Sequence, residues 1–330
     1  MGFGDYLHWT AVVRDMYKYI NSGSINERLD KINKLKNNYL KKFNKYGVQE
    51  FKHEDNNKDF KFFIFISNAN CPLFKHKEGK EIFHNNPYVT KSPAKYPNVI
   101  MLIIVSSDYF IVQEKRFLDH KHVVEQYCEN LGFTELKIKF SNEGDIHFTE
   151  EEINKVKKSI PNNEFVFIEA VNHKPGRSYP FEKYQELVDT FKDKIEFVQI
   201  SPEKYGVKDN KVLQGVTNYI GDFTFRETML FMSYSKFCIV NHGGLSIASA
   251  VTKTKTICFY PALFNPRMVT YDSEIDVYVA DENHQSCGQF DGNYREVIKR
   301  FPNGCPKCWD LYCNFDNNKV IEIINKLIVD

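Results

Sequence analysis

The amino-acid sequence predicts an α/β protein built from two doubly wound domains that face a cleft. Apolar runs of strand length alternate with amphipathic stretches of helix length, and 330 residues provide for two domains of about 100–200 residues each. Strands that are apolar throughout are typical of parallel sheets covered on both faces. The predicted strands are Phe62–Ile66, Val99–Val105, Phe165–Ala170, Ile195–Ile200, Phe237–Val240, Thr256–Tyr260 and Asp276–Ala280.

Apolar residues at helical spacing lie between and after these strands. They predict helices at Phe181–Lys192 and Thr224–Ser235, and an amphipathic helix at Asn317–Leu327. The Lys- and Asn-rich segment Asn21–Asp59 is expected to form helices and a solvated loop. A polar stretch between Phe140 and Pro161 marks the change of domain. The expected division is an N-terminal domain at 1–155, a C-terminal domain at 156–315 and a terminal helix at 316–330.

Composition excludes several classes of protein. Hydrophobic residues make up 42% and charged residues 26%, as in globular rather than disordered chains. With 44 basic and 43 acidic residues, the net charge of +1 argues against a dedicated nucleic-acid binder. No apolar run approaches the roughly 20 residues of a membrane span, and the N-terminus has no secretory signal pattern. We expect a cytoplasmic protein, with peripheral contact to the inner membrane face left open.

A phosphate-binding turn is predicted within Phe237–Tyr260. A strand is followed by two glycines and then by a helix of small residues. Glycines allow close approach of the backbone to a ligand, and a helix N-terminus offers free N–H groups and a positive dipole end. The same pattern is equally typical of a strand–turn–helix packed without a ligand. The candidate residues are Asn241, His242, Gly243, Gly244, Leu245 and Ser246.

A basic loop is predicted between the strand that ends near Ala170 and the helix that Pro180 begins. It carries Lys174, Arg177 and Ser178. Cations at the carboxyl end of a strand suit a diphosphate. The alternative is a solvated loop with two exposed cations.

A third candidate lies near the N-terminus, where glycines precede Asp5 at the start of a helix. A carboxylate in this place is suited to take a proton from an acceptor hydroxyl. The alternative is an acidic residue that only caps the helix. His8, one turn further on, is a second candidate for the base.

Together, in this order and spacing, these segments resemble glycosyltransferase family 9, the lipopolysaccharide heptosyltransferase group with the GT-B fold of two Rossmann-like domains. The similarity covers most of the C-terminal half and parts of the N-terminal half. The segments that carry it are Gly4-Asp5 with the following helix, Asp119–Gly132, Arg177-Ser178-Tyr179-Pro180, Leu213–Thr228 and Asn241–Ile247.

The resemblance implies an inverting, metal-independent transfer of a sugar from an ADP-, GDP- or UDP-linked donor to a saccharide or glycolipid acceptor. It implies that Asp5 is the general base and that no cofactor is required. Lys174 and Arg177 would neutralise the departing diphosphate, whose phosphates the backbone at 243–245 would bind. Thr224 and Glu227 would lie near the nucleotide. It also implies a terminal helix that packs back across the domains.

The chain differs from the family pattern at three positions, so the resemblance does not specify the donor sugar. His242 stands where the family has an acidic residue, Ile247 replaces a His, and Tyr179 replaces a Trp. Only three residues precede Gly4-Asp5, so the N-terminal domain is expected to lack the family's first strand or to be built differently. Two alternatives remain open: a non-catalytic nucleotide-sugar-binding relative and a nucleotide-sugar epimerase.

Four cysteines near the C-terminus form a separate cluster that includes a Cys-x-x-Cys pair. This spacing is compatible with a structural zinc site. The alternatives are reduced packing cysteines or a local disulfide, and nothing indicates a catalytic thiol. The residues are Cys287, Cys305, Cys308 and Cys313.

Overall fold

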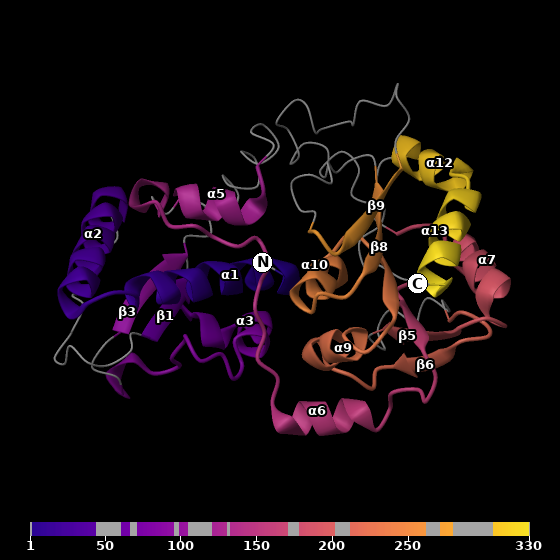
Figure 1. The fold of residues 1–330 in the computed structure, drawn as a ribbon, viewed down its shortest axis with the longest axis horizontal. Helices are drawn as coiled ribbons and strands as arrows, with labels where there is room; N and C mark the ends of the chain where they lie inside the picture. The colour runs from indigo at the N-terminus through magenta and orange to yellow at the C-terminus, as the bar shows by residue number, and fades with distance from the viewer. Residues whose placement is uncertain are drawn as a thin grey trace. The chain divides into compact units, whose positions relative to one another are not determined.

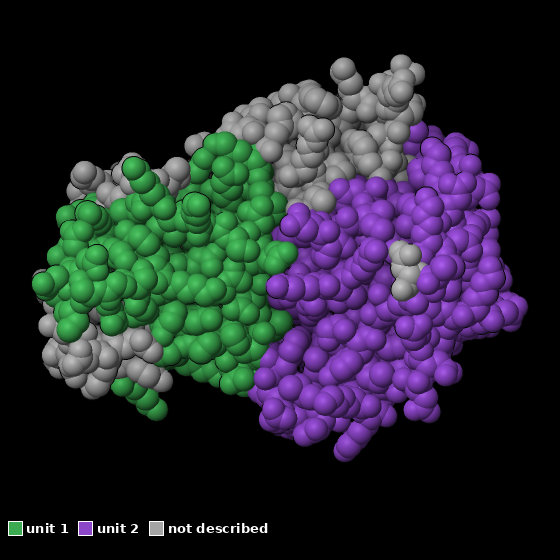
Figure 2. All heavy atoms as spheres, viewed as in Figure 1, with its two compact units in different colours: residues 1–147 green, residues 148–330 purple. Residues whose placement is uncertain are grey.

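A computed structural model of the chain divides into two compact units, residues 1–147 and residues 148–330. Most elements are labelled in Figure 1, and the two units have different colours in Figure 2. The structure describes residues 2–43, 61–66, 71–95, 99–104, 121–130, 133–170, 178–201, 212–261, 271–279 and 306–329.

The first unit has a small sheet in the order β2-β1-β3. β1 (Lys61–Ile66) runs parallel to β3 (Val99–Ile104) and antiparallel to the two-residue β2 (Cys71–Pro72). Both longer strands coincide with predicted ones. The short elements around the sheet are α3 (Lys77–Ile82), α5 (Val123–Asn130) and the 3-10 turns Leu73–Lys75, Pro93–Lys95 and Phe133–Leu136.

Helix α1 (Phe3–Ile20) is the centre of the first unit, and α2 (Ile25–Phe43) follows it. α1 is buried on most of its circumference, as expected for a core helix. It packs on α3 and α5, where Trp9 stacks on Tyr127 with ring centroids 4.6 Å apart. Within the described residues no strand precedes α1. No described helix, α1 included, has both the length and the hydropathy needed to span a bilayer.

The second unit contains a six-stranded sheet, parallel throughout, in the order β6-β5-β4-β7-β8-β9. Numbered within the unit this is the order 3-2-1-4-5-6 of a Rossmann-like doubly wound sheet. The sequence predicted five of the strands but not β6, because its residues TNYI are polar and partly exposed. The strands are β4 (Phe165–Ile168), β5 (Glu196–Ser201), β6 (Thr217–Ile220), β7 (Phe237–Asn241), β8 (Thr256–Pro261) and β9 (Glu274–Val279).

Helices cover both faces of this sheet (Figure 1). α7 (Phe181–Phe191), α12 (Pro306–Asn314) and α13 (Asn318–Val329) lie on one face and share an apolar core with the sheet. α9 (Phe225–Met232) and α10 (Gly244–Val251) lie on the other. α13 confirms the predicted terminal helix and buries Val320, Ile324 and Leu327 in the core of the second unit. That it also packs across the domains stays a prediction.

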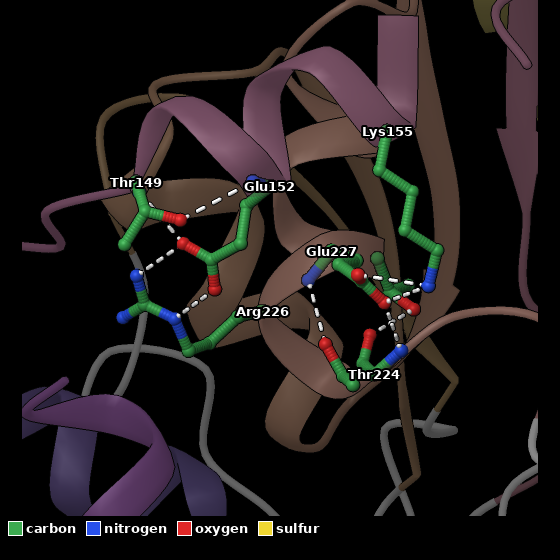
Figure 3. A network of polar contacts seen from close by, with 7 residues as sticks. Thr149, Glu152, Lys155, Thr224, Arg226 and Glu227 are labelled. Atoms are coloured by element: carbon green, nitrogen blue, oxygen red, sulfur yellow. Dashed lines mark hydrogen bonds and ion pairs between the residues drawn. The ribbon is translucent and has the colours of Figure 1, made fainter. Parts of the chain in front are cut away.

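A polar clamp joins α6 (Glu150–Lys157) to α9 (Figure 3). The Arg226 guanidinium, only 2% exposed, donates to both oxygens of Glu152 at 2.6 and 2.8 Å. Burial raises the pKa of Glu152, but hydrogen bonds from Arg226 and Thr149 outweigh burial and hold this pKa below its usual value. The clamp makes α6 part of the second unit, which begins at residue 148, whereas the sequence analysis placed the boundary after residue 155.

Candidate functional site

The doubly wound sheet has its switch point between β4 and β7, its two central strands. From β4 the chain crosses through α7 to β5 on one side, and from β7 it crosses through α10 to β8 on the other. In sheets of this kind ligands bind outside the carboxyl ends of the strands at the switch point. Glu169 follows the last residue of β4, and Asn241 is the last residue of β7. These two residues therefore mark the candidate site.

Asn241 ties together the two ends of the predicted basic loop. Its side chain is fully buried. The amide nitrogen donates to the carbonyl oxygen of Glu169 at 3.1 Å, and the amide oxygen accepts from the backbone N–H of Tyr179 at 2.7 Å. Lys174 and Arg177 lie between these anchors, in 171–177, outside the described residues. Ser178 is described and partly buried beside Tyr179.

Glu169 is a site residue that the sequence analysis missed. One of its carboxylate oxygens accepts from the backbone N–H of Asn241 at 3.1 Å. Burial raises the pKa of Glu169 to about 8, against the opposing effect of this hydrogen bond. The side chain is therefore mostly protonated at neutral pH, and it adds little negative charge to a site for an anion. Its position as the first polar residue after a buried strand is the signal that could have identified it.

The turn from β7 into α10 presents backbone donors at the same edge of the sheet. Gly243 has extended backbone and precedes the first residue of α10, Gly244. The N–H groups of a helix's first turn have no acceptors within the helix, so those of Gly244 and Leu245 are available to a ligand. The Ser246 hydroxyl is engaged locally: it accepts from the Gly243 N–H at 3.2 Å and donates to the Gly243 carbonyl at 3.0 Å.

His242 packs against β8 and is hydrogen-bonded to it. Its imidazole stacks on the ring of Tyr260 with centroids 4.8 Å apart, and its backbone N–H donates to Phe259 at 3.0 Å. The Tyr260 hydroxyl in turn donates to Glu274 of β9 at 2.8 Å. Burial raises the pKa of Glu274 to about 8. Tyr260 is a further residue next to His242 that sequence reasoning did not identify, because β7 and β8 meet only in the folded sheet. Glu274 is the first residue of β9 and pairs with the first residue of β8, so it lies at the amino end of the sheet, outside the candidate site.

Thr224 and Glu227 form a helix cap in the structure. The Thr224 hydroxyl accepts from the Glu227 N–H at 3.2 Å, and Glu227 accepts from the Thr224 N–H at 2.8 Å. Glu227 also pairs with Lys155 of α6 at 2.8 Å (Figure 3). These contacts stabilise the first turn of α9, which accounts for both residues without a ligand. Their placement beside a nucleotide stays a prediction.

The proposed base, Asp5, belongs to the first turn of α1 in the first unit. Its partly buried carboxylate accepts from the backbone N–H of Gly2 at 2.8 Å, which is the capping contact that the sequence analysis gave as an alternative. His8 is 2% exposed, and its ring packs edge-on to His122 with centroids 5.9 Å apart. Burial of this kind suits a core histidine better than a base that meets an acceptor.

The predicted zinc cluster is only partly described. Cys287 and Cys305 lie outside the described residues, while Cys308 and Cys313 lie on α12. Cys313 is an exposed free thiol. Among the described residues no group of His, Cys, Asp or Glu has the arrangement of a metal site. A structural zinc therefore stays a prediction.

Comparison with known proteins gives information on the fold. No protein-family model and no curated protein matches the sequence. Among solved structures, a family 9 glycosyltransferase from Veillonella parvula DSM 2008 aligns with 100% of this chain and 95% of its own, at a TM-score of 0.58 and 11% identity. The chain has the fold of that family, two Rossmann-like domains as in GT-B enzymes, as the sequence predicted. At 11% identity the similarity establishes the fold and nothing further.

Two more structures align over smaller shares and at lower scores. The E. coli ADP-heptose LPS heptosyltransferase II aligns with 58% of this chain at a TM-score of 0.43 and 12% identity. The iron-containing heptosyltransferase TibC in complex with ADP-D-β-D-heptose aligns with 82% of this chain at a TM-score of 0.48 and 13% identity. The chain spans 54% of the first and 76% of the second.

Proposed function

We propose that this protein is a glycosyltransferase that moves a sugar from a nucleoside diphosphate donor to a saccharide or glycolipid acceptor. The observation that carries the proposal is the edge of the sheet at the β4–β7 switch point. There, Asn241 ties the ends of a loop that contains two cations, next to the glycine turn that begins α10. An anion-binding edge of this kind suits the diphosphate of a nucleotide sugar.

The chemical role of the second unit is to stabilise the leaving group. As the sugar departs, negative charge grows on the diphosphate. The N–H groups of Gly244 and Leu245 and the dipole of α10 stabilise this charge without rearrangement, because the backbone is fixed before reaction. Lys174 and Arg177 supply full positive charges. Protonated Glu169 lies at the same edge without repelling the phosphates.

In the first unit, Asp5 is the proposed general base for the acceptor hydroxyl. Direct attack by this hydroxyl on the anomeric carbon inverts its configuration and forms no covalent sugar–enzyme intermediate. With leaving-group charge neutralised by cations and N–H groups, the reaction needs no metal. Turnover that is unchanged in EDTA would agree with this step, and turnover lost with EDTA and restored by one divalent ion would contradict it.

A nucleotide screen tests the donor site first. Thermal unfolding is followed with ADP, UDP, GDP, CMP and their common sugar conjugates. A ligand at about 100 times its Kd adds about 2.7 kcal/mol of stability, which is a shift of roughly 5–10 °C for a domain of this size. Arg177→Gln should abolish the shift, whereas Lys192→Gln, a change in the exposed Asp189–Lys192 pair, should not. No shift with any nucleotide would reject the donor site.

A second candidate is a protein that binds nucleotide sugars without transferring them. It is favoured by the contact between Asp5 and Gly2, since a carboxylate used as a helix cap is explained without catalysis. The two candidates differ in one measurement. The transferase hydrolyses its correct donor slowly even without acceptor, whereas the binding protein returns the donor intact.

A further inference from the structure

A pocket of about 280 Å³ lies in the first unit, away from the proposed reaction centre. It is formed by the last turns of α1 and by the segment that follows the 3-10 turn at 133–136. Its lining residues are Asp15, Lys18, Tyr19, Lys137, Ile138 and Lys139. The volume is just below the roughly 300–1,000 Å³ of drug-sized ligand sites, so it suits a single charged saccharide unit rather than a nucleotide sugar.

The charge of this pocket is positive. Asp15 is its one carboxylate, and Arg14 neutralises it through two hydrogen bonds at 2.8 and 3.2 Å. The remaining charges are three lysines, Lys18, Lys137 and Lys139, for which the described residues provide no carboxylate partner. Three cations around one cavity repel one another, and an anion bound among them would remove that repulsion.

The pocket is held in place by partly buried hydrogen bonds. Besides pairing with Arg14, Asp15 accepts from the backbone N–H of Ser141 at 2.7 Å. A second bond, from the N–H of Asp145 to the Thr10 hydroxyl at 2.6 Å, fixes the same segment to α1. Lys137 has a φ of 53°, a conformation that residues other than glycine seldom adopt. The chain thus holds a lysine at a position where its backbone would favour glycine.

The pocket is distinct from the proposed catalytic centre. α1 begins near the letter N in Figure 1 and runs towards α2. Asp5 lies in the first turn of α1, whereas the pocket begins at Asp15 and reaches Tyr19. At about 1.5 Å per residue, the helix separates Asp5 from the pocket by about 15–20 Å. A ligand here does not contact the proposed base.

We propose that this pocket is a binding site for a phosphate-bearing ligand, either a free phosphate or diphosphate or the phosphate of a sugar. Lysine binds phosphate as a mobile point charge and does not need the planar match that arginine makes with carboxylates. The three lysines supply ammonium donors to the phosphate oxygens, and the Tyr19 ring offers an apolar wall. The Lys31 ammonium lies over this ring, 5.0 Å from its centroid.

Residue-resolved lysine acetylation, read by mass spectrometry on the full chain, tests the proposal without interference from the second unit. The probes are inorganic pyrophosphate, glucose 1-phosphate and glucuronate, at constant ionic strength. Acetylation of Lys18, Lys137 and Lys139 should slow together with a phosphate probe, while exposed Lys80 on α3 serves as the internal control. Protection by pyrophosphate alone identifies a free phosphate, and stronger protection by glucose 1-phosphate identifies a phosphosugar.

Lys139→Gln should raise the ligand concentration needed to protect Lys18 by about three- to tenfold, as expected for the loss of one partly solvated charge contact. Lys80→Gln should leave it unchanged. The proposal is overturned if no phosphate probe protects the three lysines more than Lys80, or if glucuronate protects them better than either phosphate. Protection that Lys139→Gln does not weaken would overturn it as well.

Discussion

The side-chain oxygen of Asn241 accepts a hydrogen bond from the backbone N–H of Tyr179 at 2.7 Å. This bond joins the end of β7 to the residue just after the basic loop, while the amide nitrogen of Asn241 binds Glu169 just before the loop. One buried amide therefore determines where the loop leaves the sheet and where it returns.

Replacing Asn241 by Ala should destabilise the protein by about 2–4 kcal/mol, because it leaves a buried N–H and a buried carbonyl without partners. Urea unfolding measures this loss. The matched control is Asn218→Ala on β6, where the exposed side chain makes only 3.5 Å contacts and its loss should matter little. Nucleotide affinity of Asn241→Ala should also fall at temperatures where the variant is folded. Unchanged affinity would show that Asn241 does not position the loop.

Gly244→Pro tests the N–H donors of α10. Proline is tolerated as the first residue of a helix, and the extended backbone of Gly243 suits the residue before a proline. The substitution removes one N–H group and leaves the helix in place. We expect about a tenfold or greater loss of nucleotide affinity by calorimetry, since one charge-assisted hydrogen bond disappears. Gly244→Ala keeps the N–H and is the control; equal losses in both variants would indicate crowding rather than a lost donor.

Asp5→Asn separates catalysis from helix capping. The amide oxygen of Asn can still accept from the Gly2 N–H, so the first turn of α1 should be retained. It cannot accept a proton, so transfer should slow by about 10²–10⁴-fold while donor affinity stays the same. The measurement is the turnover rate once a donor is identified. Wild-type turnover in Asp5→Asn would exclude Asp5 as the base.

Glu169 should make stability depend on pH. Its folded pKa of about 8 lies above the usual 4.5, so between these values the folded chain binds more protons than the unfolded chain. Its contribution to stability is therefore complete below about pH 4.5 and is lost as pH rises to 8, by at most about 1.4 kcal/mol per pH unit. Glu169→Gln should flatten this slope in unfolding experiments from pH 5 to 9. Glu164→Gln, whose side chain is 74% exposed, should not.

Breaking the α6–α9 clamp should lower the free energy of unfolding. Arg226→Met leaves the 15% exposed Glu152 without its cation, and we expect a loss of about 2–4 kcal/mol in the free energy of unfolding. Adding Glu152→Gln should restore part of this loss, because the unpaired charge disappears. Lys192→Met in an exposed pair is the control. If the double variant is no more stable than Arg226→Met, the unpaired charge of Glu152 is not the cause of the lost stability.

The sequence predicted the central strands because they are buried on both faces and therefore apolar throughout. Phe165–Ile168 and Phe237–Asn241 lie within two residues of the expected limits. β6 was not predicted, because its residues are partly polar and partly exposed. The extent of α1 was not predicted beyond its start, because a mostly buried helix lacks a clear polar face.

The site was predicted as a set of residues close in sequence. Gly243, Gly244 and Asn241 follow directly from the strand–turn–helix pattern. Glu169 could not be connected with them, because strand β4 meets β7 only after the sheet has formed. The roles of Thr224 and Glu227 also depend on α6, whose Lys155 lies about 70 residues earlier.

The central place of β4 has a consequence for synthesis on the ribosome. β4 is the first strand of its sheet to emerge, and Val166 pairs with Phe237, about 70 residues later. Until β7 has been translated, one edge of an entirely apolar strand has no neighbour, and such edges promote aggregation. Pairings this distant in sequence also form slowly. The yield of folded protein should therefore depend on translation speed and chaperone supply through this stretch, more than on the stability of the finished fold.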